Sequence, residues 1–519
     1  MSAATWPRGT VQLSLASMLR ESAWRSADKI AAREGEVALT YAELWTEARK
    51  RATALAGLGV EPGQPVALLA TNGLDFVTSY YAVLACGAVV VPIPPMLVAP
   101  EIADLLEDCG AELALVEGDL GAELRSASES TGTQVLVLRD GGPDDLARRA
   151  AGSEPLPDAL PREPLDPAVV FYTSGTTGRP KGAVLTHFNL TMNCFVNALI
   201  ANDLSCDDVV LGCLPLFHTF GQTVALNSTF LHGSQIVLQR RFDPVESLDL
   251  MHRHGIDVMV GVPTMYIALL EALGDRPAPK LRVCISGGAP LPVAVLEEFE
   301  ARFGCRIQEG YGLSETSPTA SANQPAIGLR PGSIGHPIWG VDIEIADAEI
   351  EDRIELMPVG ERGEIVIRGH CVFDGYLNMP KATEAAMVDG WFRTGDIGTK
   401  DEDGFRHVVG RKKDMILRGG FNIYPREVEE AMARHPAVAE VAVIGIPHPV
   451  HGEEILAVVV ADTSGPGASG EELLEWIRKR VAHHKRPRRV EFVDELPLGP
   501  SRKVLKRVLR DRFAETSDG

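Results

Sequence analysis

The chain has 519 residues, of which 45% are hydrophobic and 23% are charged, and its formal net charge at pH 7 is −21. At about 100 to 200 residues per domain, this length and apolar content predict several hydrophobic cores rather than one. The excess of acidic residues excludes a surface that binds nucleic acid or anionic membranes as a whole, so a polyanionic ligand would have to meet a local cluster of cations.

The first residues and the cysteines indicate a cytoplasmic protein. The opening MSAATWPRGTVQLSLASMLRES lacks a charged segment followed by an uninterrupted apolar block, so we expect no secretory signal. The most apolar window, residues 80–98, contains Pro92, Pro94 and Pro95, which favours a helix followed by a buried strand over a membrane span. The eight cysteines are scattered without a C-x-x-C pair, which argues against a disulfide framework and a zinc site.

Helix-like and strand-like segments alternate in two parts of the chain. The first part, residues 39–119, begins with a capping box at Thr40 and Glu43 ahead of a long amphipathic helix, and strands such as PVALLA and AVVVP follow. The second part, residues 209–308, contains strands such as DVMVGVP and helices such as TMYIALLEALG. This alternation predicts two doubly wound, parallel α/β subdomains. We expect residues 141–167, rich in Pro, Asp and Arg, to form a surface linker.

The last part of the chain has a different pattern. Short strand-like runs separated by Gly, Asp and Pro over residues 332–409 predict a small β-barrel or a distorted sheet. A compact α+β pattern follows Gly410, with helices PREVEEAMARHP and GEELLEWIRKRVA and strands EVAVIGI and EILAVVVAD. We therefore expect a large N-terminal domain over residues 1–412 and a small α+β C-terminal domain over residues 413–519.

One glycine-rich stretch, YTSGTTGRPKG at residues 172–182, predicts an anion-binding loop. Its glycines let backbone amides approach an anion closely, and its hydroxyls and Lys181 add donors. It is not a Walker A loop, because it lacks the G-x4-G-K-[ST] spacing and no helix-like segment begins after Gly182. Taken alone, the stretch is also compatible with a plain turn between two strands.

Seven further motifs follow this loop in the order found in one family of enzymes. They are PLFHTFG, SGGAPL, GYGLSET, GEIVIRG, WFRTGD, GRKKDMILRGGFNIYP and PSRKVLKR, and with the loop they span nearly the whole chain. On these motifs the chain resembles the adenylate-forming enzymes, the group of acyl-CoA synthetases, luciferases and peptide-synthetase adenylation domains. The sequence of the segment that begins with PLFHTFG is most similar to that of bacterial medium- and long-chain fatty-acid–CoA ligases.

The resemblance implies a reaction in two steps that uses ATP, Mg²⁺ and CoA. A carboxylate first attacks the α-phosphate of ATP, which releases pyrophosphate and leaves an acyl-adenylate. A thiol then displaces AMP and takes the acyl group. The first step depends mainly on positioning and on neutralising phosphate charge.

The resemblance assigns nucleotide-binding roles to residues in several motifs. Glu315 would hold Mg²⁺, Thr316 would contact the α-phosphate, and Tyr311 would stack on adenine. Asp396 would accept hydrogen bonds from both ribose hydroxyls, with Arg411 as its cationic neighbour. Outside its motif, Glu315 would more often be a solvated glutamate and Asp396 a turn residue. The other expected contacts are the phosphate-loop residues Thr173, Ser174, Gly175, Thr176, Thr177, Gly178 and Lys181, and the adenine- and carboxylate-lining residues Gly288, Ala289, Pro290 and Gly312.

The resemblance also implies a mobile C-terminal domain. Lys503 would bridge the substrate carboxylate and the α-phosphate during adenylation. Rotation about Lys413 would then withdraw Lys503 and bring Gly419 and Gly420 toward the pantetheine arm of CoA. Arg502 departs from the family pattern, in which a glycine precedes this lysine, and an arginine there restricts the backbone of the loop.

The PLFHTFG motif and the residues after it suggest the acyl site. By resemblance His218 is a gate between the acyl pocket and the thiol tunnel, and the alternative is a half-buried histidine after a strand. A helix over residues 223–231 would form an apolar pocket wall, with Val224, Ala225 and Asn227 as lining residues. The stretch offers no cation for a second carboxylate and no aspartate for an amino group, which argues against malonate-like acids and amino acids.

The leading hypothesis is therefore an ATP- and Mg²⁺-dependent ligase that joins a medium- or long-chain fatty acid to CoA. The alternatives are a ligase for an aryl or unusual acid, an acyl-AMP ligase that loads a carrier protein, and a nucleotide-binding regulator without turnover. We expect a small-molecule carboxylic acid, ATP and CoA as partners of a monomer or homodimer, and neither nucleic acid nor an integral membrane segment.

Overall fold

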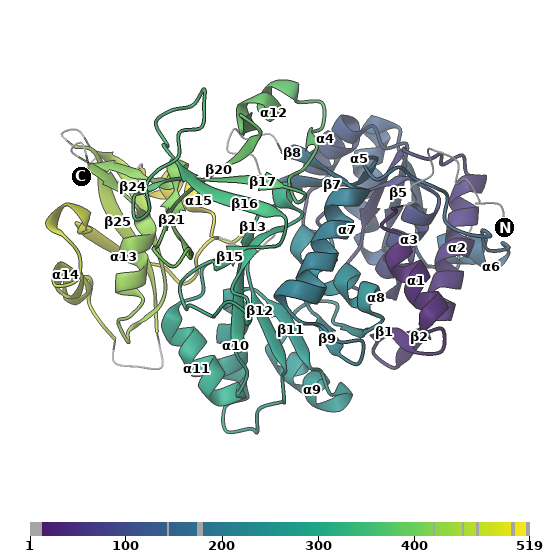
Figure 1. Cartoon of the computed structure of the whole chain (residues 1–519), viewed down its shortest axis with the longest axis horizontal. Coiled ribbons are helices and arrows are strands. Elements are labelled where there is room, and N and C mark those ends of the chain that lie inside the picture. The colour runs from purple at the N-terminus through teal and green to yellow at the C-terminus, as the bar shows by residue number, and fades with distance from the viewer. Residues whose placement is uncertain are drawn as a thin grey trace, which may run out of the picture. The chain divides into compact units, whose positions relative to one another are not determined.

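The structure is a computed structural model, and it describes residues 13–142, 145–173, 180–418, 421–448, 451–462, 467–499 and 504–514 (Figure 1). The chain divides into two compact units. The first comprises Met1–Leu291, Val295–Ile343 and Ile367–Phe392, and the second comprises Pro292–Ala294, Glu344–Val366 and Arg393–Gly519. Lys413 lies within the second unit, and the predicted domain boundary at this residue stays a prediction.

A seven-stranded sheet in the first unit confirms the first α/β subdomain. Its order is β18 (Gly375–Tyr376), β8 (Lys181–Thr186), β7 (Pro167–Thr173), β4 (Val89–Pro92), β3 (Pro65–Leu69), β5 (Leu113–Val116) and β6 (Gln134–Val137). The five strands from β7 to β6 are parallel, whereas β8 and β18 add antiparallel pairings at one edge. The helices of this segment are α2 (Tyr41–Gly57), α3 (Leu74–Ala85), α4 (Ala99–Cys109), η1 (Gly118–Leu120), α5 (Gly121–Thr131) and α6 (Leu146–Ala151).

Local sequence signals explain where several of these elements begin. The predicted capping box forms at α2, because Glu43 N donates to Thr40 Oγ1 at 3.2 Å and Thr40 N donates to Glu43 Oε2 at 2.8 Å. The apolar window at residues 80–98 divides into the end of α3 and strand β4, as predicted. No helix in the described ranges combines the length and apolar character that a membrane crossing needs.

The expected linker at residues 141–167 requires a correction, because it contains helix α6. Asp145 caps this helix by accepting a hydrogen bond from Arg148 N at 3.0 Å. Leu146 and Ala150 are buried, and α2 and α6 are in contact. Two apolar positions four residues apart were too weak a helix signal beside the surrounding Pro and Asp.

A nine-stranded sheet confirms the second α/β subdomain in the same unit. Its order is β15 (His336–Pro337), β14 (Thr319–Ala322), β13 (Ile307–Gly312), β12 (Val283–Ser286), β11 (Val258–Gly261), β9 (Val209–Gly212), β10 (Gln235–Leu238), β1 (Ile30–Glu34) and β2 (Val37–Thr40). Strands β13 to β1 are parallel along this order. The helices are α1 (Ser17–Arg25), α7 (His187–Val196), η2 (Asn197–Ala201), η3 (Gly221–Asn227), α8 (Ser228–His232), α9 (Pro244–His254), α10 (Pro263–Leu273), α11 (Val293–Phe303) and η4 (Ser314–Thr316).

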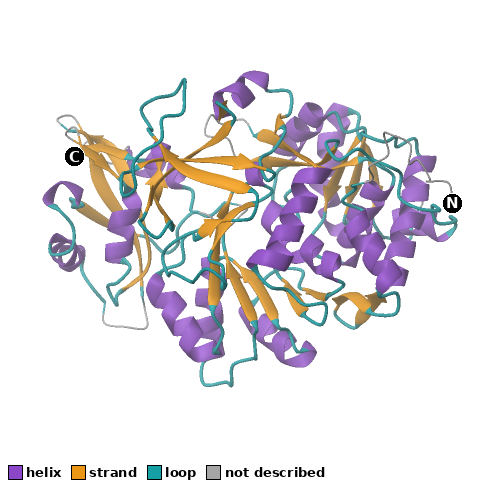
Figure 2. Ribbon diagram, in the orientation of Figure 1, coloured by secondary structure: helices purple, strands orange, loops and turns teal. Residues whose placement is uncertain are grey.

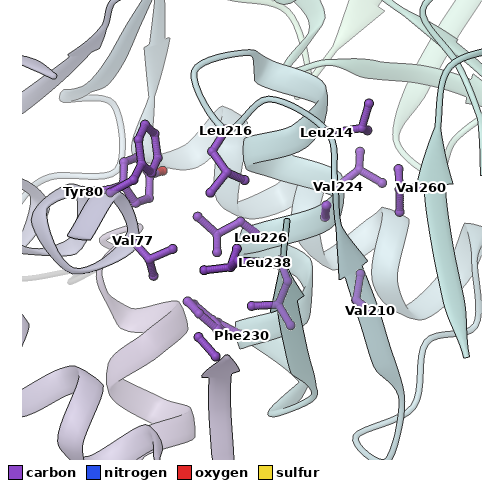
Figure 3. Close-up of a cluster of buried hydrophobic side chains, with 14 of the residues drawn as sticks. Val77, Tyr80, Val210, Leu214, Leu216, Val224, Leu226, Phe230, Leu238 and Val260 are labelled. Atoms are coloured by element: carbon purple, nitrogen blue, oxygen red, sulfur yellow. The ribbon is translucent and has the colours of Figure 1, made fainter. Parts of the chain in front are cut away.

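Helices lie beside the strands of these two sheets (Figure 2), and a shared hydrophobic core contains residues from both segments of the chain. Figure 3 shows part of this core, where Leu226, Leu238 and Phe230 gather near Val77. Each of these four side chains is at most 3% exposed. Their packing joins helix α3 to the segment from η3 to β10, and it thereby holds the two predicted subdomains together within one unit.

The segment predicted as a small barrel or distorted sheet, residues 332–409, contributes β15 and β18 to the two larger sheets, and its other strands belong to a separate five-stranded sheet. The strands of this sheet are β16 (Val341–Ala346), β17 (Gly363–Gly369), β20 (Trp391–Lys400) and β19 (Met387–Val388), with β21 (Arg406–Arg411) paired to β20. Helix α12 (Pro380–Ala386) precedes β19, and the short helix η5 (Lys412–Asp414) follows β21.

The α+β pattern after Gly410 is confirmed. The sheet has the order β23 (Phe421–Ile423), β22 (Ile416–Arg418), β25 (Gly452–Ala461) and β24 (Val438–His448), with β26 (Arg489–Phe492) paired to β25. The helices are α13 (Pro425–Met432), α14 (Gly470–Arg478), η6 (His483–Lys485) and α15 (Lys506–Ala514). Alternate residues of β25 serve two cores, with Ile455 and Val459 in one and Leu456 and Val458 in the other. The sheet is therefore covered on both faces.

Candidate active site

The glycine-rich stretch connects two antiparallel strands rather than a strand and a helix. Thr173 at the end of β7 lies opposite Lys181 at the start of β8, and Thr173 Oγ1 donates to the Lys181 carbonyl oxygen at 3.4 Å. This hairpin agrees with the distinction from a Walker A loop. The other predicted loop residues, Ser174, Gly175, Thr176, Thr177 and Gly178, lie outside the described residues.

The base of this hairpin is closely packed. A Cβ added to Gly182 would lie 2.9 Å from Cγ1 of Val170 and 3.3 Å from Cβ of Leu377, so a larger residue would push the neighbouring strands apart. The hydroxyl of Tyr172 donates to Asp108 Oδ2 at 2.7 Å, which anchors β7 to helix α4. The two ends of the loop are therefore held by close packing and by this hydrogen bond.

Lys181 and Glu315 both contact the side chain of Tyr376. The ammonium nitrogen of Lys181 lies 4.8 Å from the centroid of the Tyr376 ring, and the Tyr376 hydroxyl donates to Glu315 Oε1 at 2.9 Å. Strand β18 carries Tyr376 and pairs with β8, with Tyr376 opposite Ala183. The structure thus brings together the predicted phosphate lysine and the predicted metal carboxylate, 134 positions apart in the sequence, through a residue that sequence analysis missed.

Burial and charge keep the Tyr376 hydroxyl protonated. Burial raises its pKa well above the ordinary value for tyrosine, and the charge of Glu315 and the hydrogen bond to it raise the pKa further. The hydroxyl is therefore a permanent donor to Glu315 at neutral pH. The available sequence signal was a Gly-Tyr pair at residues 375–376, four residues before the proline that begins helix α12.

Glu315 and Thr316 lie in the short helix η4, in the turn between β13 and β14. The Thr316 hydroxyl accepts a hydrogen bond from Leu313 N at 2.8 Å and donates one to the Pro318 carbonyl oxygen at 2.5 Å. Its side chain is fully buried, so the structure shows it closing this turn. The predicted contact of Thr316 with the α-phosphate stays a prediction.

The other residues expected around the adenine and the acyl group lie at the carboxyl ends of neighbouring parallel strands. Gly288, Ala289 and Pro290 are exposed after β12, and Tyr311 lies near the end of β13 beside it. A Cβ added to Gly312 would lie 1.6 Å from the Pro318 carbonyl oxygen, so this position has no room for a side chain. Ligands bind in open α/β sheets outside the carboxyl ends of the strands, which suits the predicted roles.

His218 lies in the loop that follows β9, a parallel strand of the same sheet. Its Nδ1 accepts a hydrogen bond from Phe220 N at 3.3 Å, and its own amide donates to the Pro215 carbonyl oxygen at 3.2 Å. The ring of Phe220 comes within 3.1 Å of the place that a Cβ on Gly287 would take. His218 is therefore held at the same edge of the sheet as the SGGAPL motif, and its gate role stays a prediction.

The predicted pocket wall at residues 223–231 is helical, but its first part is the π-helix η3. Val224 packs beside Val260 (Figure 3), and Ala225 is fully buried. The Asn227 amide accepts from the Tyr81 hydroxyl at 2.7 Å and donates to the Tyr80 hydroxyl at 3.0 Å. Both hydrogen bonds hold the Asn227 side chain in the core. To line a pocket, Asn227 would have to break its hydrogen bonds to both tyrosines.

Two buried oxygens on η3 have no hydrogen-bond partner among the described residues. They are Gln222 Oε1 and Thr223 Oγ1, and both side chains are fully buried. Gln222 still donates through Nε2 to the Leu216 carbonyl oxygen at 3.1 Å. Buried polar atoms are usually paired, so these two oxygens are candidates to receive a donor from a ligand or water.

In the second unit, Asp396 and Arg411 lie opposite each other on the antiparallel strands β20 and β21. Arg411 Nε donates to Asp396 Oδ1 at 2.9 Å, and the carboxylate is almost completely buried. The part of strand β20 that precedes Asp396 is held by Glu364, which accepts from the Gly395 amide at 2.9 Å and from Arg393. Glu364 and Arg393 lie within the GEIVIRG and WFRTGD motifs, but no local pattern in either motif predicts that they pair. Lys503, Arg502, Gly419 and Gly420 lie outside the described residues.

Most of the chain is similar to known proteins of the family that the motifs predicted. Residues 19–377 match the family described as AMP-binding enzyme, and residues 427–503 match the AMP-binding enzyme C-terminal domain. A feruloyl-CoA synthase from Amycolatopsis sp. is 40% identical, with 93% of this chain and 96% of that protein covered. A long-chain-fatty-acid–CoA ligase from Bacillus subtilis (strain 168) is 36% identical, with 96% and 95% covered. The crystal structure of ATP-bound MatB from Rhodopseudomonas palustris has a TM-score of 0.91 and 33% identity, and covers 98% of this chain and 100% of that chain.

Proposed function

Because the chain belongs to the AMP-binding enzyme family and is an acid–thiol ligase, we propose that it activates an apolar carboxylic acid with MgATP and passes the acyl group to CoA. The observation that carries the proposal is the contact of Lys181 and Glu315 with the same tyrosine at the base of the glycine-rich loop. A cation and a carboxylate held there suit the triphosphate and its metal ion.

The donor set at this place fits Mg²⁺. Mg²⁺ is usually held by one or two carboxylates together with phosphate oxygens and water, rather than by a cage of protein ligands. Glu315 supplies one carboxylate, and the described residues contain no group of three or more His, Cys, Asp and Glu side chains placed to hold a metal. When bound, Mg²⁺ would offset the negative charge of the phosphates.

The proposed first step forms a bond between a substrate carboxylate oxygen and the α-phosphorus and breaks the bond to the bridging oxygen of pyrophosphate. Lys181 would hold the β- and γ-phosphates, which leave together. Lys503 would approach the α-phosphate from the C-terminal domain, and Asp396, oriented by Arg411, would bind the ribose hydroxyls. In the second step the CoA thiol displaces AMP after rotation at Lys413, with Gly419 and Gly420 beside the pantetheine arm.

We retain a medium- or long-chain fatty acid as the first candidate substrate. Val224 and Ala225 make the predicted wall apolar, and a similar protein is named as a long-chain-fatty-acid–CoA ligase. The second candidate is a hydroxylated aryl acid, which the unpartnered oxygens of Gln222 and Thr223 favour because a phenolic hydroxyl would supply the missing donor. The 40% identity to a feruloyl-CoA synthase supports this second candidate.

The deciding experiment is a coupled AMP-release assay with ATP, Mg²⁺ and CoA. The panel contains fatty acids of about two to eighteen carbons, benzoate, cinnamate and ferulate, a range that separates the two candidate substrates. Release with any of these acids, dependent on both ATP and CoA, supports the ligase, and the preferred acid chooses between the candidates. Absence of AMP and pyrophosphate release with every acid would refute the proposal.

Two matched measurements test the remaining alternatives. Replacing CoA by a holo carrier protein and comparing rates separates a CoA ligase from a ligase that loads a carrier. ATP–pyrophosphate exchange that Lys503→Ala abolishes would exclude a regulator without turnover.

A further inference from the structure

We propose that Tyr376 is a positioning residue for adenylation, which orients the Glu315 carboxylate through its hydroxyl and the Lys181 ammonium through its ring. The inference rests on the proposed function, because it concerns the binding of MgATP. Tyr376 belongs to none of the motifs that suggested the site from the sequence, and its role follows from contacts made in three dimensions.

The backbone around Tyr376 is fixed by pairing with the strand that carries Lys181. Asp374 N donates to the Val184 carbonyl oxygen at 3.0 Å, and Leu377 N donates to the Gly182 carbonyl oxygen at 2.8 Å. Tyr376 N donates to Thr383 Oγ1 at 2.9 Å, which ties the segment to helix α12. The position of the tyrosine ring is therefore coupled to the base of the glycine-rich loop.

The backbone of Gly375 lets the chain reach this position. Its φ is +142°, a conformation that side chains rarely allow. An added Cβ there would lie 2.9 Å from Cγ2 of Thr383. A residue with a side chain at this position would therefore displace the tyrosine that follows it.

The same short segment holds Glu315 at two points. The amide of Phe373 donates to the Glu315 carbonyl oxygen at 2.9 Å, and the Tyr376 hydroxyl donates to its Oε1 at 2.9 Å. The Phe373 and Tyr376 rings meet edge to face, with centroids 4.8 Å apart. The backbone and the side chain of Glu315 are thus both held in one conformation. The carboxylate would therefore lose little rotamer freedom when it binds the metal ion.

The ring and the hydroxyl of Tyr376 serve different charges. The ammonium of Lys181 is attracted to the ring by a cation–π interaction, whereas the hydrogen bond that the hydroxyl makes among the described residues goes to the Glu315 carboxylate. Removing the hydroxyl should therefore affect metal binding, and removing the ring should affect both metal and phosphate binding. A purely structural tyrosine would not separate these two effects.

The test compares Tyr376→Phe, Tyr376→Leu and a control, Tyr41→Phe, with the wild type. Tyr41 is a good match because its buried hydroxyl also makes a short hydrogen bond, to the Ser234 carbonyl oxygen at 2.5 Å, in the core away from the loop. The first readout is the Kd of Mn²⁺, used as the probe ion, for the chain saturated with a non-hydrolysable ATP analogue, followed by electron paramagnetic resonance. The second readout is the Mg²⁺ dependence of ATP–pyrophosphate exchange, and thermal unfolding checks the fold.

Tyr376→Phe should raise the Kd of Mn²⁺ and the Mg²⁺ concentration for half-maximal exchange about tenfold, since it removes a hydrogen bond to a charged group. At saturating Mg²⁺ its exchange rate should recover, with the KM for ATP within about twofold of wild type. Tyr376→Leu should also raise the KM for ATP, and Mg²⁺ should not restore it. Combined with Glu315→Gln, Tyr376→Phe should cause no further loss of metal affinity.

The positioning role would be overturned if Tyr376→Phe and Tyr41→Phe both bound Mn²⁺ with the Kd of an active wild type. That result would leave the proposed function intact. A rate loss in Tyr376→Phe that Mg²⁺ does not restore would also overturn the positioning role, because such a loss indicates a structural effect. A wild-type chain that neither binds Mn²⁺ with the analogue nor exchanges pyrophosphate would overturn the proposed function together with this inference.

Discussion

Arg393 donates two hydrogen bonds to Glu364 Oε2, from Nε at 2.9 Å and from Nη2 at 2.6 Å, while only 8% and 4% of the two side chains are exposed. Glu364 Oε1 also accepts from the Gly395 amide at 2.9 Å, one residue before Asp396. The pair therefore connects strand β17 to the part of strand β20 that carries the proposed ribose-binding carboxylate.

Glu364→Ala should destabilise the protein by about 3–5 kcal/mol, because it leaves the buried guanidinium of Arg393 without its counter-charge. Thermal unfolding and urea unfolding measure the loss. The double replacement Glu364→Leu with Arg393→Leu should cost less than Glu364→Ala alone, since no buried charge is left unpaired. A double variant that is less stable than the single variant would show that the pair contributes more than charge compensation.

Lys181→Ala should slow adenylation about a hundredfold, the scale on which removal of one group that stabilises developing charge acts. ATP–pyrophosphate exchange measures this step. Thioester formation from preformed acyl-adenylate should stay near the wild-type rate, because the β- and γ-phosphates have already left. Lys50→Ala is the control, since Lys50 pairs with Glu47 on the surface of α2. Equal slowing of both half-reactions would contradict the assignment of Lys181 to pyrophosphate.

Gly312→Ala should destabilise the turn that holds Glu315 and Thr316, because the new Cβ would lie 1.6 Å from the Pro318 carbonyl oxygen. We expect a loss of about 3 kcal/mol, near the upper end for overpacking, together with a loss of exchange activity. Gly57→Ala at the end of α2 is the control, because no atom lies within 4 Å of its added Cβ. Wild-type stability in Gly312→Ala would show that the turn has another accessible conformation.

His187 should make the stability of the protein depend on pH below neutrality. Burial lowers its pKa from the ordinary 6.5 to about 4, and the nearby charge of Arg162 lowers it while that of Asp166 raises it. Its Nδ1 accepts a hydrogen bond from Leu15 N at 3.0 Å, which the neutral ring can do. In the unfolded chain His187 binds a proton near pH 6.5, whereas in the folded chain it does so only near pH 4. The contribution of the neutral His187 to the free energy of unfolding is therefore fully present above pH 6.5 and is lost as the pH falls toward 4.

This dependence is measured by comparing the wild type with His187→Gln in urea unfolding from pH 8 to pH 4. Between pH 6.5 and 4 the free energy of unfolding of the wild type should fall relative to that of the variant by up to about 1.4 kcal/mol per pH unit. Above pH 7 the difference between them should be constant. If the free energies of unfolding of the wild type and the variant follow parallel curves over the whole pH range, folding does not lower the pKa of His187.

Local signals in the sequence identified most elements that depend on neighbouring residues. The capping box at Thr40 formed as expected, because both of its hydrogen bonds join residues three positions apart. The alternation of helices and strands correctly indicated the parallel central strands of two sheets, since a parallel pair needs a crossover between its strands, whereas the antiparallel strands at the sheet edges were not predicted. Helix α6 was missed because its cap and two buried residues were too short a signal among turn-forming neighbours.

The candidate site divides in the same way. Lys181, Glu315, Asp396 and Arg411 could be predicted as site residues because their surrounding motifs resemble those of a known family. Tyr376 and the pair Glu364–Arg393 were not predicted, because what distinguishes them is contacts with residues distant in the sequence.

The sequence by itself thus determined the family, the order of the elements and the residue types available for binding a nucleotide, since local hydrogen bonding, apolar periodicity and motif spacing lie within short stretches of chain. The tertiary structure decided which of those residues meet. Strand β18 joins the edge of a sheet whose neighbouring strand begins nearly 200 residues earlier, and this pairing places Tyr376 between Lys181 and Glu315. Such a pairing is selected by the fit of all the packed elements together, which no single stretch of sequence contains.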